Sequence, residues 1–252
     1  MNFSRIAPRM VQAGFAGAVL GAWHLATSSG QVSPLLLPPL ASVYRALVSL
    51  LATGNFWPDL RVTGSELLIA FSIAAIGGCV IGYLVGRSGY AVQVFDPLFA
   101  GLYSIPAILL FPLYVLFFGI GPGSKIAMGI TIAFFPVVLS TIAGLRRVDR
   151  VYISAARSMG ASGPRMFWRV MLPAAFPVIF AGLRMGLILA FLAILGTEMV
   201  ASFAGLGHRI VDLAENMDSA RMFAYVVFVV GIAFLLNVAV SFVDARLRRE
   251  AL

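Results

Sequence analysis

The stretch LLIAFSIAAIGGCVIGYLVG at residues 67–86 contains no charged side chain and lies between Glu66 and Arg87. A helix needs roughly 20 apolar residues to cross the hydrocarbon of a bilayer, and this stretch is long enough. The rest of the chain is similar, since 61% of its 252 residues are hydrophobic and 11% are charged. A soluble domain carries about 25% charged residues. The stretch therefore predicts a spanning helix in an integral membrane protein.

Five further stretches have the length and apolar composition of membrane spans. They cover residues 10–28, 97–124, 126–145, 178–201 and 222–243. The run 178–201 contains Arg184 near its start and Glu198 near its end. The predicted fold class is all-α, a polytopic membrane protein with about six transmembrane helices. We divide it into residues 1–61, an N-terminal helix with an external loop, and residues 62–252, a core of five transmembrane helices.

The basic residues predict the orientation of these spans, because cytoplasmic connections are enriched in Lys and Arg. The formal net charge is +8, but the basic residues lie between the apolar runs and form no continuous stripe for a nucleic acid. Five lie on one side of the predicted membrane: Arg45, Arg61, Lys125, Arg209 and Arg221. Twelve lie on the other: Arg5, Arg9, Arg87, Arg146, Arg147, Arg150, Arg157, Arg165, Arg169, Arg246, Arg248 and Arg249. Both termini are therefore predicted to be cytoplasmic.

Small residues recur at every fourth position of the run 67–86. They are Ala70, Ala74, Gly78, Gly82 and Gly86. This spacing places them on one helix face, which another helix can approach closely. Packing within one subunit is the simpler interpretation, and an interface between subunits is the alternative. Gly182 and Gly186 repeat the pattern in a later span.

The arginine-rich connection at residues 146–177 is the most specific part of the sequence. Its segment 151–177 reads VYISAARSMGASGPRMFWRVMLPAAFP. Gly160 is suited to ending a helix over 152–159, and Pro164 to beginning a second helix that ends before Pro173. The loop also contains more apolar residues than a plain turn needs. We expect two short helices that form a docking surface for a soluble cytoplasmic partner.

The spacing of this loop resembles the EAA loop of ATP-binding-cassette (ABC) importer permeases. That motif has EAA, three residues, Gly, nine residues, a β-branched residue, any residue and Leu-Pro. Here Ser154-Ala155-Ala156 precedes Gly160, and nine residues then lead to Val170, Met171, Leu172 and Pro173. Ser154 stands where the family usually has Glu. The resemblance implies ATPase-coupling residues, namely Ser154, Ala155, Ala156, Arg157, Met159, Gly160, Ala161, Val170, Leu172 and Pro173.

The resemblance to the nitrate, sulfonate and taurine permease group extends over most of the chain. It includes LPPLASVYRAL at 37–47, IPAILLFPLYVLFFGIG at 105–121 and LPAAFPVIFAGLRMGL at 172–187. It implies a type I importer permease in a bacterial inner membrane. Its expected partners are a second permease copy, two cytoplasmic ATPases and an external substrate-binding protein. The expected solute is a small anion such as a sulfonate, taurine or nitrate, and the alternative is a pyrimidine or flavin precursor.

The chain lacks the residues that ATP hydrolysis would need. A phosphate-binding P-loop requires Gly-Lys followed by Ser or Thr. Lys125 is the only lysine, and it lies between Ser124 and Ile126. We therefore expect a transport subunit rather than an enzyme, with no cofactor in this chain and with ATP and magnesium in the partner ATPase. A secondary transporter or channel would instead be expected to have ionisable relays inside its spans and often an internal repeat. The sequence has one acid deep in a span and no convincing internal repeat.

The sequence also resembles one class of enzyme in a single tetrapeptide. Residues 160–163 match the GxSG of intramembrane serine proteases. Ser162, however, lies in the arginine-rich cytoplasmic loop. His24 and His208, the two possible bases, lie near the outer face and cannot reach it. This function is therefore disfavoured.

Four residues are candidates for the translocation path. Glu198 is the one acid deep in a span, where a charge costs roughly 3 kcal/mol or more unless it is paired, protonated or hydrated. Lining of the path and a structural hydrogen bond are both open interpretations. We expect Glu198→Ala to lower transport while the complex stays assembled. Pro106 interrupts backbone hydrogen bonding within a span, and Tyr103 and Ser104 precede it as possible polar lining groups.

Overall fold

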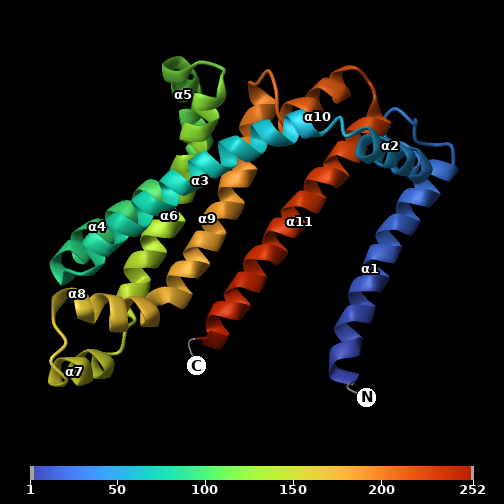
Figure 1. Ribbon diagram of the computed structural model, residues 1–252. Helices are drawn as coiled ribbons and strands as arrows, with labels where there is room; N and C mark the ends of the chain where they lie inside the picture. The colour runs from blue at the N-terminus through green and yellow to red at the C-terminus, as the bar shows by residue number, and fades with distance from the viewer. Residues whose placement is uncertain (1–2, 251–252) are drawn as a thin grey trace. The chain divides into compact units, whose positions relative to one another are not determined.

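The computed structural model describes residues 3–250, and it describes side chains for residues 10–12, 14–244 and 246. The described part contains helices and no strand. The elements are α1 Phe3–Ser28, α2 Leu40–Thr53, α3 Trp57–Gly86, α4 Gly89–Tyr103, the 3₁₀ turn η1 Ala107–Leu110, α5 Phe111–Phe118, α6 Pro122–Arg146, α7 Arg150–Ser158, α8 Gly163–Met166, the π-helical turn η2 Phe167–Met171, α9 Leu172–Val200, α10 Leu206–Glu215 and α11 Ser219–Glu250 (Figure 1).

Most of the predicted spans form continuous apolar helices. Four stretches are long and apolar enough to cross a membrane: Trp57–Gly86, Pro122–Arg146, Gly163–Val200 and Ser219–Asp244. The predicted first span, 10–28, is helical within α1. It is less apolar than the other spans, because it contains Gln12, His24 and three glycines.

The predicted span 97–124 is wrong as a single helix. The structure breaks it into α4 and the η1–α5 segment, which are bent by 79° relative to each other and could together make a fifth span. The break lies at Ser104–Pro106. Proline has no N–H to donate and disfavours the helical conformation of the preceding residue, here Ile105. Pro106 then precedes the 3₁₀ turn with an extended backbone.

The chain divides into two compact units. The first comprises Met1–Trp57 and Arg209–Val230, and the second comprises Pro58–His208 and Gly231–Leu252. In the first unit, Trp23 donates a hydrogen bond from Nε1 to the carbonyl of Pro38 at 3.0 Å. Its ring also packs edge-on against Phe223. These contacts join α1 to the segment before α2 and to the start of α11.

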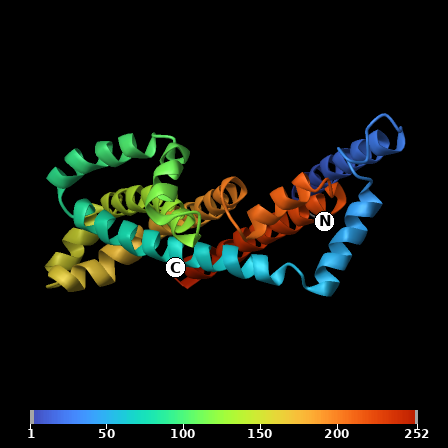
Figure 2. The same cartoon turned by 90° about the horizontal axis from the view of Figure 1, so that it is seen from above.

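The second unit is built around α6, with α3 and α9 packed against it (Figure 1, Figure 2). The small residues of α3 face α6. A Cβ at Gly78 would lie 2.8 Å from a methyl group of Val137, and one at Gly82 would lie 2.6 Å from Cβ of Thr141. Gly186 of α9 makes a similar approach to the carbonyl of Ala133. This geometry confirms the prediction of packing within one subunit.

Candidate functional site

The loop predicted to be cytoplasmic begins with α7, whose two ends are both capped. Asp149 precedes the helix, and its Oδ1 accepts a hydrogen bond from the backbone N–H of Val151 at 2.9 Å. At the other end, the N–H of Ala161 donates to the carbonyl of Ala156 and the N–H of Gly160 donates to that of Arg157. This pair of bonds is a Schellman motif. It requires a left-handed residue, and Gly160 supplies it with φ +79°.

The loop packs against α3, α6 and α9, the three helices at the centre of the second unit. Ile153 of α7 and Phe167 of η2 pack on a buried apolar cluster formed by Leu145, Val148, Ala175 and Ile179. The ring of Phe167 also contacts that of Tyr83 on α3, with centroids 4.3 Å apart. A displacement of the loop would therefore move α3, α6 and α9, because close-packed interiors transmit strain.

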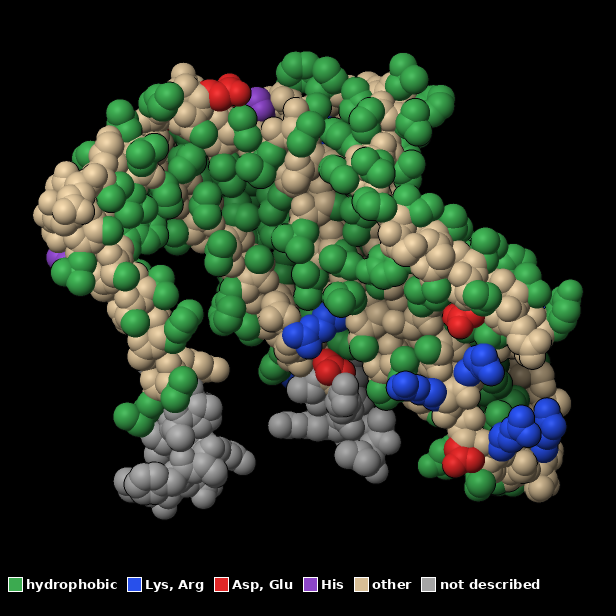
Figure 3. Space-filling model, turned by 180° about the vertical axis from the view of Figure 1, so that it is seen from behind, with side chains coloured by type: hydrophobic (Ala, Val, Ile, Leu, Met, Phe, Trp, Pro, Cys, Tyr) green, Lys and Arg blue, Asp and Glu red, His purple; other side chains and the backbone are tan. Residues whose placement is uncertain are grey.

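The outward face of the loop is apolar as well as basic. Met159 is 87% exposed and Trp168 is 66% exposed, and Val151 and Tyr152 are also exposed. Ser154, Ala155, Arg157 and Gly160 are exposed, whereas Ala156 and Ala161 are half-buried. Arginine side chains gather at the end of the second unit that carries α7 and α8 (Figure 3). Exposed apolar side chains ringed by charge are typical of a docking surface.

The sequence predicted that the second helix of the loop ends before Pro173, and this prediction is wrong. Pro164 begins α8 as expected, but the helix continues through η2 into α9, so that Gly163–Val200 is one apolar helix. The π-helical turn at Phe167–Met171 lies just before Pro173 and shifts the hydrogen-bond register there, so the helix passes a residue that has no N–H to donate. Val170, Leu172 and Pro173 therefore lie on this helix rather than on the exposed α7 end.

Glu198 is buried, and its carboxylate has specific partners. Only 1% of the residue is exposed. Oε1 accepts a hydrogen bond from the hydroxyl of Thr63 at 2.7 Å, and Oε2 accepts one from the N–H of Gly207 at 2.7 Å. The hydroxyl of Thr63 in turn accepts a bond from the N–H of Leu206 at 2.9 Å. These bonds support the structural interpretation of Glu198, and its assignment to the translocation path stays a prediction.

Sequence reasoning missed two charged neighbours of Glu198. Glu66 is 2% exposed and Lys125 is 1% exposed, although each had marked the end of a predicted span. The ammonium of Lys125 donates hydrogen bonds to the carbonyls of Ile120 and Gly121 at 2.6 and 2.9 Å. Oε2 of Glu66 has no hydrogen-bond partner among the described residues. Hydropathy could not reveal this burial, because an average along the sequence does not show which face of a helix a charged residue occupies or what packs against it.

The other predicted path residues lie at the break between α4 and η1. Tyr103 lines a cleft of about 360 Å³ with apolar walls and one threonine, Thr131. The hydroxyl of Thr131 lies 2.7 Å from that of Tyr114. The hydroxyl of Ser104 instead bonds locally to the carbonyl of Gly101. Glu198 does not line this cleft, so the structure does not bring the four predicted path residues together.

A further polar contact joins α9 to the part of α11 in the second unit. Nη2 of Arg184 donates a hydrogen bond to Oδ1 of Asn237 at 2.6 Å. Arg184 also lines a cleft of about 230 Å³ together with Phe180, Ala181, Met185, Ile188 and Asp244. Arg184 lies in a predicted span, and the sequence pattern indicates no role for it. A charged residue inside a span was the signal that could have identified it.

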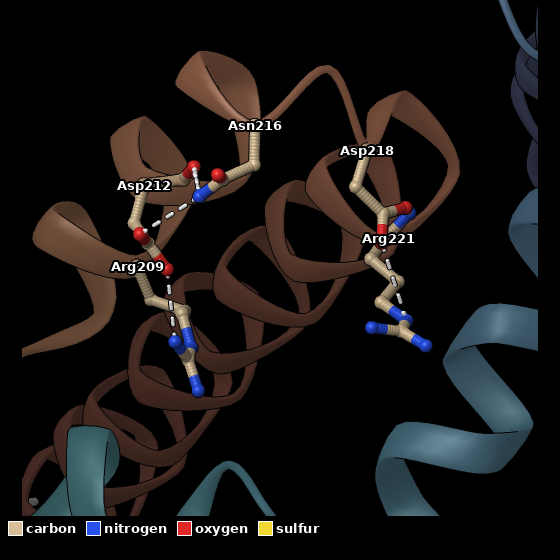
Figure 4. Close-up of polar contacts among 5 residues, drawn as sticks. All are labelled: Arg209, Asp212, Asn216, Asp218 and Arg221. Carbon is tan, nitrogen blue, oxygen red and sulfur yellow. Dashed lines mark hydrogen bonds and ion pairs between the residues drawn. The ribbon is translucent and has the colours of Figure 1, made fainter.

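The first unit contains the largest of these clefts, of about 440 Å³, on the side predicted to be external. Its charged groups pair locally (Figure 4): Nη1 of Arg209 lies 2.9 Å from Oδ2 of Asp212, and Nε of Arg221 lies 3.4 Å from Oδ2 of Asp218. The amide of Asn216 donates to Oδ1 of Asp212 at 3.1 Å. Exposed pairs of this kind contribute roughly 0–1 kcal/mol, so we interpret them as local supports for α10 and α11.

Solved structures share this helical arrangement. An inward-facing structure of the MetNI methionine ABC transporter has a TM-score of 0.62 and 20% identity, over 76% of this chain and 97% of that chain. A crystal structure of an amino acid ABC transporter with histidines has a TM-score of 0.63 and 20% identity, over 81% of this chain and 97% of that chain. The fold is therefore that of type I ABC importer permeases.

Sequence comparison then identifies the family. Residues 75–249 match the family described as binding-protein-dependent transport system inner membrane component. The taurine transport system permease protein TauC of Escherichia coli K12 is 31% identical over 93% of this chain and 87% of its own length. The putative aliphatic sulfonates transport permease protein SsuC of the same strain is 31% identical over 85% of this chain and 80% of its own length. The nitrate import permease protein NrtB of Leptolyngbya laminosa is 28% identical over 77% of this chain and 69% of its own length.

The chain belongs to the binding-protein-dependent transport system inner membrane component family. It is a multi-pass transport subunit of the inner membrane, the permease of an ABC importer.

Proposed function

We propose that two copies of this permease form the path for a small anion of the sulfonate, taurine or nitrate type. An external binding protein delivers the solute, and two separate ATPase subunits bind ATP and magnesium on the cytoplasmic side. The names of the relatives support the solute class, since TauC, SsuC and NrtB are named for taurine, sulfonates and nitrate.

The observation that carries the coupling proposal is the construction of the loop. Its outward face exposes Met159 and Trp168 to a partner, while its inward face packs through Ile153 and Phe167 onto the central helices. A force applied by a partner at Met159 would therefore reach α3, α6 and α9 without passing through a flexible segment. The residues from Ser154 to Ala161 contact the ATPase, and those from Val170 to Pro173 join the loop to α9.

The test replaces Gly160 with residues that differ in their tolerance of positive φ. A Cβ at this position would meet no atom within 4 Å, so a substitution acts through backbone strain alone within this chain. Gly160→Val should strain the Schellman motif by about 1–2 kcal/mol, whereas Gly160→Asn should be tolerated. We expect the Val variant to lose most ATPase co-purification and solute uptake, and the Asn variant to keep both.

A second variant separates docking from folding. Because the side chain of Met159 is almost entirely exposed, Met159→Asp should leave the thermal midpoint of the permease unchanged and still reduce ATPase co-purification severalfold. Normal ATPase binding and uptake in both Gly160→Val and Met159→Asp would defeat the coupling proposal. A permease that purifies without any ATPase would defeat the proposed function as a whole.

A further inference from the structure

Arg184 is a permanent charge within a membrane span. It lies on α9, about 9 Å along the helix from residue 178, where the sequence predicts the span to begin on the cytoplasmic side. A guanidinium stays protonated in proteins, so burial cannot be relieved by loss of the proton. A charged group at such a position is costly unless it faces a partner, a ligand or water.

The partner that the structure provides does not neutralise this charge. Asn237 is a neutral amide, and it accepts one hydrogen bond from Nη2 of Arg184 at 2.6 Å. A guanidinium has five N–H donors. Within the part of the chain that the structure describes, Arg184 has no ion pair and no other side-chain hydrogen bond. The amide therefore fixes the position of the guanidinium and leaves most of its donors available to an anion.

The guanidinium borders a cleft of suitable size for a small solute. The cleft holds about 230 Å³, the volume of roughly eight water molecules, and its walls are mainly Phe180, Met185 and Ile188. Asp244 lines the same cleft from α11 and also takes part in another interaction of the chain. The cleft thus presents a cationic donor group within a mainly apolar surface.

We propose that Arg184, positioned by Asn237, forms a binding subsite for the acid group of a small solute in the cytoplasmic half of the translocation path. The planar guanidinium suits bidentate contact with a sulfonate or carboxylate. This subsite rests on the proposed function and names the solute chemistry of that same path.

The test measures equilibrium binding to the purified, nucleotide-free permease–ATPase complex in nanodiscs, without the binding protein. Radiolabelled taurine is the zwitterionic probe, and ethanesulfonate is the probe that lacks the amine. We expect Arg184→Gln to raise the Kd for both probes at least tenfold. Arg87→Gln, which removes an exposed arginine at the end of α3, should bind as wild type does.

The variant Asn237→Asp distinguishes a binding role of Arg184 from a structural role of Arg184. The new carboxylate would form a resident ion pair with Arg184, so a structural role predicts equal or higher thermal stability and unchanged binding. The subsite predicts that this variant loses binding like Arg184→Gln, because the guanidinium is then neutralised. Wild-type affinity in Asn237→Asp, or in the folded fraction of Arg184→Gln, would overturn the inference, as would the absence of probe binding to the wild-type complex.

These outcomes are independent of the test of the ABC function. A complex that retains its ATPases and takes up solute, but binds both probes normally without Arg184, would reject the subsite alone. Failure of the chain to associate with any ATPase would reject the proposed function instead.

Discussion

At the residue scale, Glu198 shows how a buried charge is accommodated in this fold. Its two carboxylate oxygens accept hydrogen bonds from the side chain of Thr63 and the backbone of Gly207. The carboxylate therefore ties α9 both to α3 and to the loop that leads into α10. Gly205, with φ +110°, lets this loop pass close to the carboxylate, since a Cβ at that position would overlap the carboxylate of Glu198 and L side chains rarely adopt this backbone conformation.

We expect Glu198→Ala to reduce both stability and transport. The substitution leaves the donors of Thr63 and Gly207 buried without an acceptor and removes a negative charge near Lys125. Breaking a buried charged network costs about 3–5 kcal/mol. The measurements are the thermal midpoint of the purified complex and solute uptake into proteoliposomes. Reduced uptake with an unchanged midpoint would assign Glu198 to the translocation path, wild-type uptake would remove it from the path, and an unchanged midpoint would contradict the structural role.

At the element scale, α6 is the helix on which the second unit is assembled. Its buried residues include Ala133, Val137 and Thr141, which meet small residues of α3 on one side and α9 on the other. Small residues let helix backbones come close, and this proximity is what stabilises helix pairs in lipid, where the hydrophobic effect does not drive their association. The faces of α3 and α9 that contact α6 are therefore the least tolerant of added volume.

We expect Gly82→Ala to destabilise the permease by about 1–3 kcal/mol, the range typical of overpacking. The new Cβ would lie 2.6 Å from Cβ of Thr141 and 2.9 Å from the backbone oxygen of Val138, which cannot rotate away. Gly77→Ala on the same helix is the matched control, because its Cβ would lie 3.9 Å from the nearest atom, in the ring of Phe134. The thermal midpoint should fall only for Gly82→Ala. Equal midpoints for the two variants would contradict the close packing of α3 on α6.

At the scale of the whole molecule, the charge distribution sets the sidedness on which the transport mechanism depends. The loop helices α7 and α8 and the end of α11 lie at one end of the second unit (Figure 1), and the arginines gather around this loop. The positive-inside rule assigns that end to the cytoplasm. An ATPase can reach Met159 and its neighbours only if this assignment holds.

Single-cysteine labelling tests the assignment. The native Cys79 is first replaced by serine to give a background without thiols, and Arg157→Cys or Asn216→Cys is then introduced. A membrane-impermeant maleimide added to intact spheroplasts should modify Asn216→Cys and reach Arg157→Cys only after permeabilisation. Both native side chains are exposed, so neither site requires unfolding. Labelling of Arg157→Cys from outside would invert the orientation and reject the coupling role of the loop.

Several features of the site could be predicted from the sequence because their causes are local. Gly160 ends α7 since a left-handed residue is needed where the loop turns, and Pro164 begins α8 since the first helical turn tolerates proline. The continuation past Pro173 was not predictable in this way, because it depends on a π-helical turn that shifts the hydrogen-bond register of η2. The break at Pro106 was recognised only as a possible kink within a single span.

The sequence by itself predicted the membrane class and most of the spans, which the structure and the family comparison confirm, and it also predicted the sidedness and the position of the coupling loop, which stay predictions. All of these depend on composition and spacing over a few tens of residues, which hydropathy and charge counts measure directly. Only the tertiary structure decided that Glu66 and Lys125 are buried near Glu198, and that Arg184 of α9 donates a hydrogen bond to Asn237 of α11. Such pairs join residues distant in sequence, and hydrogen bonding at 2.6–2.7 Å depends on how helices pack side by side rather than on their separate compositions.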